Sequence, residues 1–496
     1  MSELDIQREH RLNKVKDLRA KGIHPYPNDF HPSMSLPGVL ENYKDYHEEK
    51  ESPDTISIAG RLIAIRGHGK TCFAHILGDG AKLQIYTRKD ILGEVNYNQF
   101  KDLDLGDLIG VQGKIFRTRT GELTLIVDEY RLLTKSLRPL PEKWHGLKDI
   151  ETRYRQRYLD LFANPQTRDI FLMRTRLVRA LRSFFDGHGF IEVETPMMQT
   201  IPGGATARPF KTYHNALNRE LYLRIAPELY LKRLVVGGFE RVYELNRNFR
   251  NEGLSTEHNP EFTMLEFYMA YANYEDLMKF TEKLFCELAQ KIKGSMTWEY
   301  QGQQIDFSPP WKSLTLRESI LEYSDLKGPD LDNKSILTSR MMAGDMPLEI
   351  PLTGKESHGR LLMKAFEALV EPHLLQPTFI TDFPKEVSPL ARSKDAQPEL
   401  VERFELYVAG KELANAFSEL NDPIDQRERF ITQIDDAEAE GMVKNVDEDY
   451  IQALEYGLPP TAGEGIGIDR LVMIFADAPS IREVILFPQL REIQKI

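Results

Sequence analysis

A short stretch at residues 249–262, "FRNEGLSTEHNPEF", combines one arginine, several carboxylates and one imidazole around a glycine and a proline. The guanidinium of Arg250 is a planar fork of donors that matches the oxygens of a phosphate group. Glu252, Glu257, Glu261 and His258 supply acceptors and an ionisable ring beside it. This mixture of residue types indicates binding of a phosphate-containing ligand.

The flanking residues predict a β-hairpin that carries this chemistry. Residues 239–252 read as one strand, 253–260 as a loop and 261–269 as the returning strand. Because side chains alternate between the faces of a strand, one hairpin face would collect Asn248, Arg250, Glu252, Phe262, Met264, Glu266 and Tyr268. Phe262 offers a flat ring for a base, and Glu266 and Tyr268 offer acceptors for a cation. These residues alone leave open a solvated hairpin with ordinary ion pairs.

A second stretch, "GKELANAFSELN" at 410–421, reads as a strand with Asn415, Phe417 and Glu419 on one face. Glu412 lies seven residues before Glu419, so a regular strand sends these two carboxylates to opposite faces. A β-bulge would bring them to the same face. Paired carboxylates of this kind can hold magnesium on a triphosphate. The alternative is two surface glutamates.

A third stretch, 457–475, contains Gly463, Gly465 and Gly467 at every second position, followed by a helix from about Ile468. Glycines at this spacing strip one face of a strand, so that a flat ligand can lie on the backbone. Arg470 falls in the first turn of the helix, where a cation opposes the helix dipole. Because this position of Arg470 is unfavourable for the helix itself, it indicates a functional role for the side chain. The pattern is not the G-x-G-x-x-G of a dinucleotide-binding fold.

Other segments predict the elements that position these residues. Residues 168–196 read as a helix, with Ile170, Leu177, Leu181 and Phe184 at helical spacing, then a strand closed by Pro196. Residues 54–134 contain five short strand-like runs separated by turn signals, which favours a small five-stranded barrel of the oligonucleotide-binding (OB) type. Residues 1–53 form an N-terminal extension with a helix at 4–20, and 135–150 a linker. Residues 151–496 form one large domain with an insertion near 325–375.

Composition limits the class of protein. The chain has 496 residues, a net charge of −12 and 28% charged residues of mixed sign, which fits a globular protein of two or three domains. Two cysteines cannot form a disulfide framework and favour a reducing compartment. The N-terminus has no apolar core of a secretory signal, and no run of about 18 apolar residues predicts a membrane span. The acidic total does not favour nucleic acid, but it leaves room for a local basic face.

In this order, the segments resemble the three signature motifs of class II aminoacyl-tRNA synthetases. The helix ending "ETP" resembles motif 1, "FRNE…HNPEF" motif 2 and "GEGIGIDR" motif 3. A barrel before the catalytic domain is similar to the lysyl, aspartyl and asparaginyl subgroup. Residues 153–161, 201–210, 224–234 and 415–423 closely resemble the bacterial lysyl enzymes. The resemblance implies an α+β fold, an antiparallel class II catalytic sheet preceded by an OB barrel.

The resemblance also implies roles for single residues. It implies ATP binding by Arg250, Glu252, His258, Asn259, Phe262, Glu412 and Arg470, with Arg250 on the α-phosphate, Arg470 on the γ-phosphate and both acting in catalysis. It implies lysine binding by Gly204, Glu228, Glu266, Tyr268, Asn415 and Phe417, and Mg²⁺ binding by Glu412 and Glu419. Arg66, Phe73, Gln84 and Glu129 would read a U-rich anticodon. Without the resemblance, Phe73 reads equally well as barrel core.

The implied activity is that of a cytoplasmic, homodimeric lysine–tRNA ligase, with motif 1 at the dimer interface. It would join L-lysine to ATP as lysyl-adenylate and transfer lysine to the 3′ end of tRNA(Lys). Three alternatives remain open. The substrate is aspartate or asparagine; the enzyme modifies a protein with lysine; or the chain is a nucleic-acid-binding or regulatory protein with an inactive synthetase domain. Arg250, Glu412, Glu419 and Arg470 argue against the last, and the barrel against the second.

Overall fold

The computed structural model of the chain describes residues 3–47, 49–141, 147–205, 207–343, 346–348, 352–439 and 446–492. It divides into two compact units, one up to Arg168 and one from Asp169 onward. Parts of the predicted linker (142–146) and of the predicted insertion (344–345 and 349–351) lie outside the described residues. No helix in the described ranges is long and apolar enough to cross a membrane.

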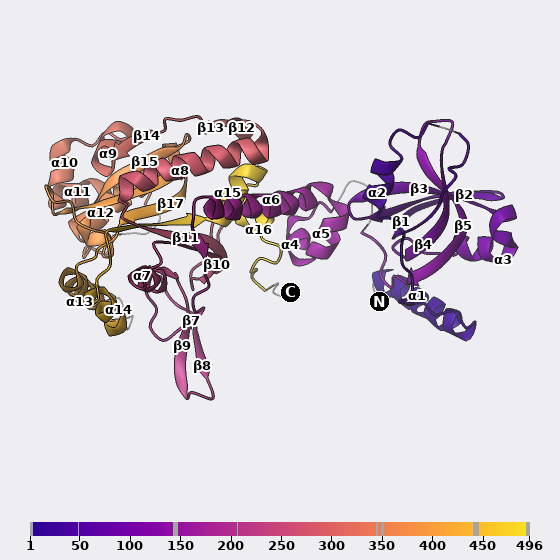
Figure 1. The fold of residues 1–496 in the computed structure, drawn as a ribbon, viewed down its shortest axis with the longest axis horizontal. Helices are drawn as coiled ribbons and strands as arrows, with labels where there is room; N and C mark the ends of the chain where they lie inside the picture. Colours follow the sequence, from indigo (N-terminus) through magenta and orange to yellow (C-terminus); the bar gives the residue numbers. More distant parts are fainter. Residues whose placement is uncertain are drawn as a thin grey trace. The chain divides into compact units, whose positions relative to one another are not determined.

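The first unit is built around a closed barrel (Figure 1). Its strands are β1 (Thr55–His68), β2 (Thr71–Gly78), β3 (Ala81–Arg88), β4 (Leu108–Arg117) and β5 (Leu123–Thr134), in the order β1-β2-β3-β5-β4. Buried residues alternate with more exposed ones along β1, because every second side chain points into the barrel core. Asp79 and Gly80, both with positive φ, make the tight turn between β2 and β3. The five predicted strands are therefore present.

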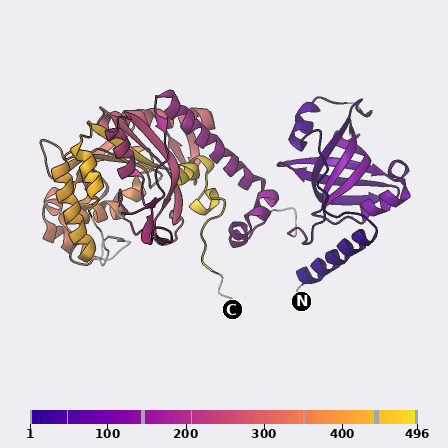
Figure 2. The ribbon, with the colours of Figure 1, turned by 60° about the horizontal axis from the view of Figure 1, so that its bottom comes forward.

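Six helices accompany the barrel: α1 (Glu3–Ala20), α2 (Leu36–Asn42), α3 (Lys89–Lys101), α4 (Ile150–Arg155), α5 (Arg157–Ala163) and the start of α6 (Pro165–Gly187). Figure 2 shows α1 as the helix that begins at the N-terminus, beside the barrel. Arg11 fastens it, donating to the backbone oxygens of Leu105, Ser136 and Arg138. The alternating pattern did not predict α3, which lies between β3 and β4.

The second unit is organised by an eight-stranded sheet in the order β14-β15-β16-β17-β18-β11-β10-β6. The strands are β6 (Ile191–Glu192), β10 (Arg241–Phe249), β11 (Glu261–Ala270), β14 (Lys312–Thr315), β15 (Thr378–Pro384), β16 (Leu400–Val408), β17 (Lys411–Ser418) and β18 (Thr461–Gly467). Only the outermost pairs, β14–β15 and β6–β10, are parallel. This antiparallel sheet in an α+β unit after a barrel is the predicted fold class.

Smaller strands and helices surround the sheet. The strands are β7 (Met198–Gln199), β8 (Lys211–His214), β9 (Arg219–Leu223), β12 (Thr297–Tyr300) and β13 (Gln303–Asp306). The helices are α7 (Glu228–Val236), α8 (Tyr274–Leu288), α9 (Leu316–Tyr323), α10 (Gly328–Asp332), α11 (Lys334–Met342), α12 (His358–Leu369), α13 (Pro423–Ala439), α14 (Glu448–Glu455), α15 (Ile468–Ala476) and α16 (Ile481–Val484). Helices α9 to α12 form the crossover between the parallel strands β14 and β15, which includes the predicted insertion.

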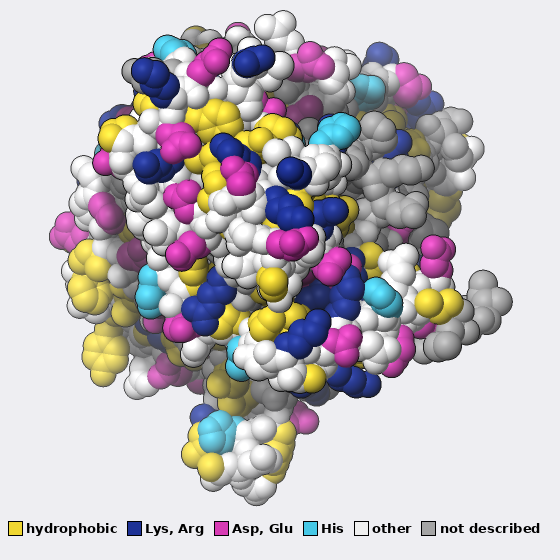
Figure 3. Space-filling view, turned by 90° about the vertical axis from the view of Figure 1, so that its right-hand side faces the viewer, with side chains coloured by type: hydrophobic (Ala, Val, Ile, Leu, Met, Phe, Trp, Pro, Cys, Tyr) yellow, Lys and Arg dark blue, Asp and Glu magenta, His cyan; other side chains and the backbone are white. Residues whose placement is uncertain are grey.

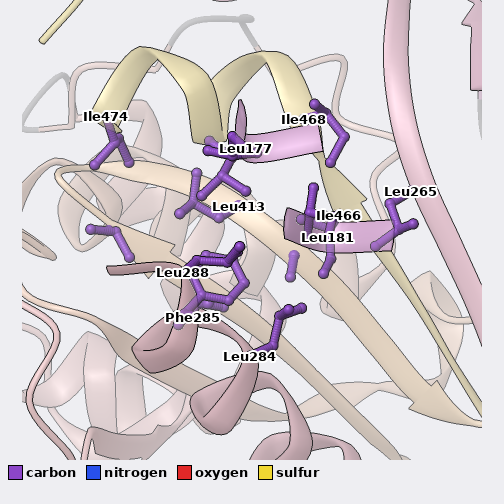
Figure 4. Close-up of a cluster of buried hydrophobic side chains, with 14 of the residues drawn as sticks. Leu177, Leu181, Leu265, Leu284, Phe285, Leu288, Leu413, Ile466, Ile468 and Ile474 are labelled. Atoms are coloured by element: carbon purple, nitrogen blue, oxygen red, sulfur yellow. The ribbon is translucent and has the colours of Figure 1, made fainter. Parts of the chain in front are cut away.

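One face of the sheet is sealed by a hydrophobic core (Figure 4). Leu177 and Leu181 of α6, Leu284 and Phe285 of α8, and Ile474 of α15 pack there against Leu265, Leu413 and Ile466 of the central strands. The periodic residues predicted for the helix of 168–187 thus face the core. Because side chains alternate along a strand, the neighbours of Leu265 and Ile466 point to the opposite face. That opposite face carries the site.

Two strand predictions were too long. The strand predicted at 239–252 ends at Phe249, because the chain turns after Arg250, where Glu252 N donates to Arg250 O. The strand predicted for "FIEVETP" is reduced to Ile191–Glu192, which pairs only with Val242 and Tyr243. Pro196 supplies no backbone donor to extend it.

Candidate active site

A cleft in the second unit contains most of the residues selected from the sequence. It consists of two adjoining cavities of about 430 and 250 Å³. Both cavities are lined by Arg250, Met264, Glu412, Asn415 and Gly465, so they form one continuous site. We call the larger cavity the inner lobe and the smaller one the outer lobe.

The outer lobe gathers all seven residues that the sequence assigned to ATP. Its lining includes Arg250, Glu252, His258, Asn259, Phe262, Glu412 and Arg470. Arg470 NH1 donates to Glu412 O at 2.8 Å, and its NH2 lies 3.2 Å from His258 Nε2. These contacts hold the guanidinium in the first turn of α15, as predicted from its position after the glycine strand.

Arg250 is arranged as an anion-binding group. Its guanidinium lies 5.1 Å from the centroid of the Phe262 ring, and its buried Nε has no hydrogen-bond partner among the described residues. A buried donor without an acceptor costs free energy, so a ligand oxygen at this position would be favoured. Arg250 and Arg470 open onto the same lobe, and two cations there suit a polyphosphate.

The inner lobe is lined by all six residues assigned to lysine: Gly204, Glu228, Glu266, Tyr268, Asn415 and Phe417. Glu228, Glu266 and Tyr268 are each at most 5% exposed. Burial raises the pKa of Glu266 to about 8, with a further contribution from Glu228, while Arg224 and Arg250 act in the opposite direction. Buried carboxylates that repel one another favour a bound cation.

The pairing of β10 with β11 explains how the hairpin serves both lobes. Asn248 lies opposite Phe262 and Glu244 opposite Glu266, so one face of β11 presents Phe262, Met264, Glu266 and Tyr268 to the cleft. This is the shared face predicted for the second strand. Asn248 is buried beneath it and donates to Glu266 Oε1 at 3.5 Å.

The alternating glycines of β18 make room for neighbouring side chains as well as for a ligand. A Cβ at Gly463 would overlap Tyr268 Cε1 and Glu419 Oε1, and one at Gly465 would lie 2.8 Å from Met264 Cε. At Gly467 the nearest atom would be 3.8 Å away. Gly463 is thus required by the walls of the inner lobe, which the sequence argument about a flat ligand did not anticipate.

The bulge predicted for the strand with Glu412 and Glu419 is present in β17, because the register with β16 shifts between Leu406 and Tyr407 and leaves Leu413 unpaired. Glu419 is fully buried and forms an ion pair with Lys232, whose Nζ also donates to Glu228 Oε1. It lies at the opposite end of β17 from Glu412. The assignment of this pair to magnesium stays a prediction.

Two further carboxylates, Glu405 on the neighbouring strand β16 and Glu371, interact with Glu412. Burial raises the pKa of Glu405, Arg403 lowers it, and the charge of Glu412 raises it again. Glu405 and Glu412 line the inner lobe, and Arg403 NH2 donates to Glu405 Oε1 at 2.5 Å. Ala409 and Gly410, both with positive φ, turn β16 back onto β17. Gly410 was the one sign of this turn that could be read from the sequence.

Four barrel residues were assigned to the anticodon. Arg66, Phe73 and Gln84 lie on the neighbouring strands β1, β2 and β3, and Glu129 lies on β5. Phe73 of β2 is 36% exposed, lies opposite Arg66 of β1, and packs on Tyr86 with ring centroids 4.5 Å apart. Phe73 is therefore a surface residue rather than barrel core. Gln84 is buried next to Phe73's strand and donates to Thr124 Oγ1 at 2.8 Å.

Glu129 stands apart from the other three residues. It is exposed on β5, opposite Gln112 and beyond a register shift in that strand pair. In Figure 3, Lys and Arg side chains lie among Asp and Glu side chains across the face shown, so the negative net charge does not make every surface acidic. That mixture leaves room for an anionic partner.

The fold and the cleft define a class of protein, and sequence comparison agrees. The family model described as tRNA synthetases class II (D, K and N) matches residues 149–491, and the model described as OB-fold nucleic acid binding domain matches residues 56–133. The chain belongs to the class II tRNA synthetases of this group. This confirms the resemblance drawn from the three motifs and the barrel.

Within this family, the chain is similar to lysine–tRNA ligases. That of Pelotomaculum thermopropionicum is 52% identical over 482 residues, covering 97% of this chain and 94% of the relative. That of Legionella pneumophila (strain Lens) is 53% identical over 486 residues, covering 97% of each chain. That of Aquifex aeolicus is 56% identical over 442 residues, covering 89% of this chain and 74% of the relative.

Proposed function

We propose that this chain is a lysine–tRNA ligase that activates L-lysine with ATP and transfers it to tRNA(Lys). The observation that carries the proposal is the division of one cleft into two lobes of different chemistry. The outer lobe presents Arg250 and Arg470, and the inner lobe presents Glu228, Glu266 and Tyr268. A triphosphate and a primary ammonium would each meet groups of opposite charge, side by side.

In the first step, a lysine carboxylate oxygen attacks the α-phosphorus of ATP, the new P–O bond forms, and pyrophosphate leaves. Charge develops on the phosphoryl oxygens in the transition state, where preorganised donors are most effective. Arg250, with its unpaired Nε, suits the α-phosphate, and Arg470 suits the far end of a bent triphosphate. The attacking carboxylate is already ionised, so no side chain is needed as a general base. In the second step the terminal hydroxyl of the tRNA attacks the carbonyl carbon, and AMP leaves.

The inner lobe selects lysine by charge. Desolvating an ammonium is unfavourable unless acceptors are already in place, and here the carboxyl groups of Glu228 and Glu266 and the phenol of Tyr268 are among the groups that line the lobe. The same carboxylates would repel an aspartate side chain. Asparagine carries no charge and would leave these acceptors unmatched. The lobe therefore favours lysine over the other two substrates of the subgroup.

Glu412 and Glu419 are the carboxylates that the resemblance assigns to a divalent cation, and Glu405, on the strand next to Glu412, is a further candidate ligand. Glu405 and Glu412 both line the inner lobe, and the charge of Glu412 raises the pKa of Glu405. No group of three or more metal-binding side chains occurs in the described part of the chain. Mg²⁺ commonly takes one or two carboxylates and completes its shell with phosphate oxygens and water. When bound, it would supply positive charge to the triphosphate.

The barrel supplies the tRNA-binding part of the proposal. Phe73 and Tyr86 form an exposed aromatic pair on which unpaired bases can stack, at about 1–3 kcal/mol per base. Arg66 lies beside Phe73, where it can contact phosphate or a base edge. A homodimer formed through motif 1 and a cytoplasmic location also belong to the proposal; both rest on the sequence pattern.

The test is ATP–pyrophosphate exchange with lysine, aspartate and asparagine offered separately. We expect exchange with lysine alone. Replacement of Glu228 by Gln should weaken lysine preference, because one acceptor of the inner lobe loses its charge. Exchange that depends on aspartate or asparagine, or lysine preference that is intact in the Glu228→Gln variant, would contradict the assignment of the inner lobe.

A further inference from the structure

Lys232 lies behind two residues that line the inner lobe, Glu228 and Phe417, and is not among the residues assigned to either substrate. It follows Glu228 by one turn of α7, and its Nζ donates to Glu228 Oε1 at 2.6 Å. The same Nζ forms an ion pair with Glu419. The side chains of Lys232 and Glu419 have no exposed surface, and that of Glu228 has 7%.

Aromatic rings enclose this ammonium. Its Nζ lies 5.5 Å from the centroid of the Phe417 ring and 6.0 Å from that of Tyr450. Burial alone would lower the pKa of Lys232, but Glu228 and Glu419 together raise it above its ordinary value. The side chain is therefore a permanent internal cation, fixed by two carboxylates and two rings.

Fold stability alone does not account for this arrangement. A buried ion pair is often no more stabilising than well-packed apolar residues of similar volume, because both charges lose their hydration. On a helix, a glutamate four residues before a lysine usually marks a surface pair that contributes little to stability. Here the pair is fully buried beside the candidate lysine site, where a charge affects the substrate directly.

The charges around the lobe suggest what this cation does. Three carboxyl groups, Glu228, Glu266 and Glu419, gather there, and the burial of Glu419 raises its pKa with Lys232 acting in the opposite direction. Without Lys232, Glu228 and Glu419 would be neighbouring buried acids, and one would take up a proton. Lys232 opposes this uptake, because its charge lowers the pKa of both glutamates against the effect of burial, and its contacts set their positions before any substrate arrives.

We propose that Lys232 is a positioning and selectivity residue, whose ammonium holds Glu228 and Glu419 as fixed carboxylates so that the inner lobe presents a preformed acceptor to the side-chain amine of the substrate. This inference rests on the proposed function, since it concerns the lysine-binding lobe. Lys232 acts through the two glutamates and touches no reacting atom. Its removal should therefore alter lysine recognition and spare ATP.

The test compares four variants in lysine-dependent ATP–pyrophosphate exchange. Lys232→Met keeps the length of the side chain and removes its charge. Lys232→Met combined with Glu419→Gln removes both charges of the pair, and Glu419→Gln alone leaves Lys232 with one partner. Lys394→Met is the control, because Lys394 also has a carboxylate partner, the partly buried Asp382, and a tyrosine ring 5.8 Å away, but does not line the cleft.

We expect Lys232→Met to lower kcat/KM for lysine at least tenfold while KM for ATP changes less than twofold. The double variant should recover at least threefold relative to Lys232→Met, because a neutral amide needs no counter-charge. Lys394→Met should leave both constants within twofold of the unmodified enzyme. A purely structural role for Lys232 would instead change the kinetic constants for lysine and for ATP together.

Three outcomes would overturn the inference: an unchanged kcat/KM for lysine in Lys232→Met, a double variant no better than the single one, or an equal loss for lysine and ATP. If Lys232→Met does not fold, Glu419→Gln decides, since we expect it to weaken lysine about tenfold and no effect there refutes the inference. Absence of lysine-dependent exchange in the unmodified enzyme would instead refute the proposed function, and the inference with it.

Discussion

Replacing Gly463 by alanine should damage the lysine lobe selectively. A Cβ at this position would overlap Tyr268 Cε1 and Glu419 Oε1 and lie 2.5 Å from Tyr268 Cδ1. Neither neighbour can move easily, because the Tyr268 ring is buried and Glu419 is held by Lys232. Overpacking of a closed site typically costs about 1–3 kcal/mol. At about 1.4 kcal/mol per tenfold change, kcat/KM for lysine should fall by roughly 5- to 150-fold.

The assay is amino-acid-dependent ATP–pyrophosphate exchange, with the lysine and ATP concentrations varied separately. Gly467→Ala is the matched control, because its Cβ would meet Leu413 O at 3.8 Å and Arg470 at 3.9 Å, which is ordinary contact. We expect the control to keep KM for lysine within about twofold. If Gly463→Ala leaves lysine kinetics unchanged, the wall of the inner lobe is not where we place it.

Three further predictions test other parts of the molecule. Arg250→Ala should raise the barrier to adenylate formation by about 3–4 kcal/mol, by analogy with loss of one oxyanion donor; near-normal pyrophosphate exchange would refute its role. Phe73→Ala should raise KM for tRNA and leave pyrophosphate exchange unchanged, whereas equal loss of both would indicate misfolding. Glu464 is buried with only a Thr281 hydroxyl donating to it at 2.5 Å, and burial raises its pKa to about 8. Because the folded chain then binds a proton that the unfolded chain releases, Glu464 should lower the free energy of unfolding progressively as the pH rises from about 4.5 to 8. Urea unfolding at pH 6 and 8.5 should show a smaller loss in Glu464→Gln, and an equal loss in both proteins would show that Glu464 does not titrate this way.

Much of the architecture was predictable because it depends on local patterns. Alternation along the barrel strands, the hairpin at 239–269 and the helix after the glycine strand follow from side-chain periodicity and turn residues. The bulge in β17 was predictable for a different reason, since Glu412 and Glu419, seven residues apart, could share a face only if one residue left the ladder. These features need no knowledge of distant segments.

The missed parts depend on how neighbouring and distant segments pack in three dimensions. Glu405 becomes a neighbour of Glu412 only once β16 folds back on β17, and the sequence argument considered only the strand that carries Glu412 and Glu419. Lys232 reads as one half of a surface helix pair until β17 and α14 bury it. The strand that ends at Phe249 was predicted to continue to residue 252. Arg250 N does donate to Pro260 O across the hairpin, but the chain turns directly after Arg250.

One residue of β17, Leu413, has no partner in the ladder with β16. The side chains of Leu413 and Ala414 both point into the hydrophobic core. Because these two successive residues take the same side, Glu412 and Asn415 both face the cleft although they are three positions apart. Deletion of Leu413 alone would leave Glu412 and Asn415 two positions apart, so a regular strand would still place both on the cleft face. A strand that lacks only this residue would therefore keep the cleft face and lose one buried side chain of the core.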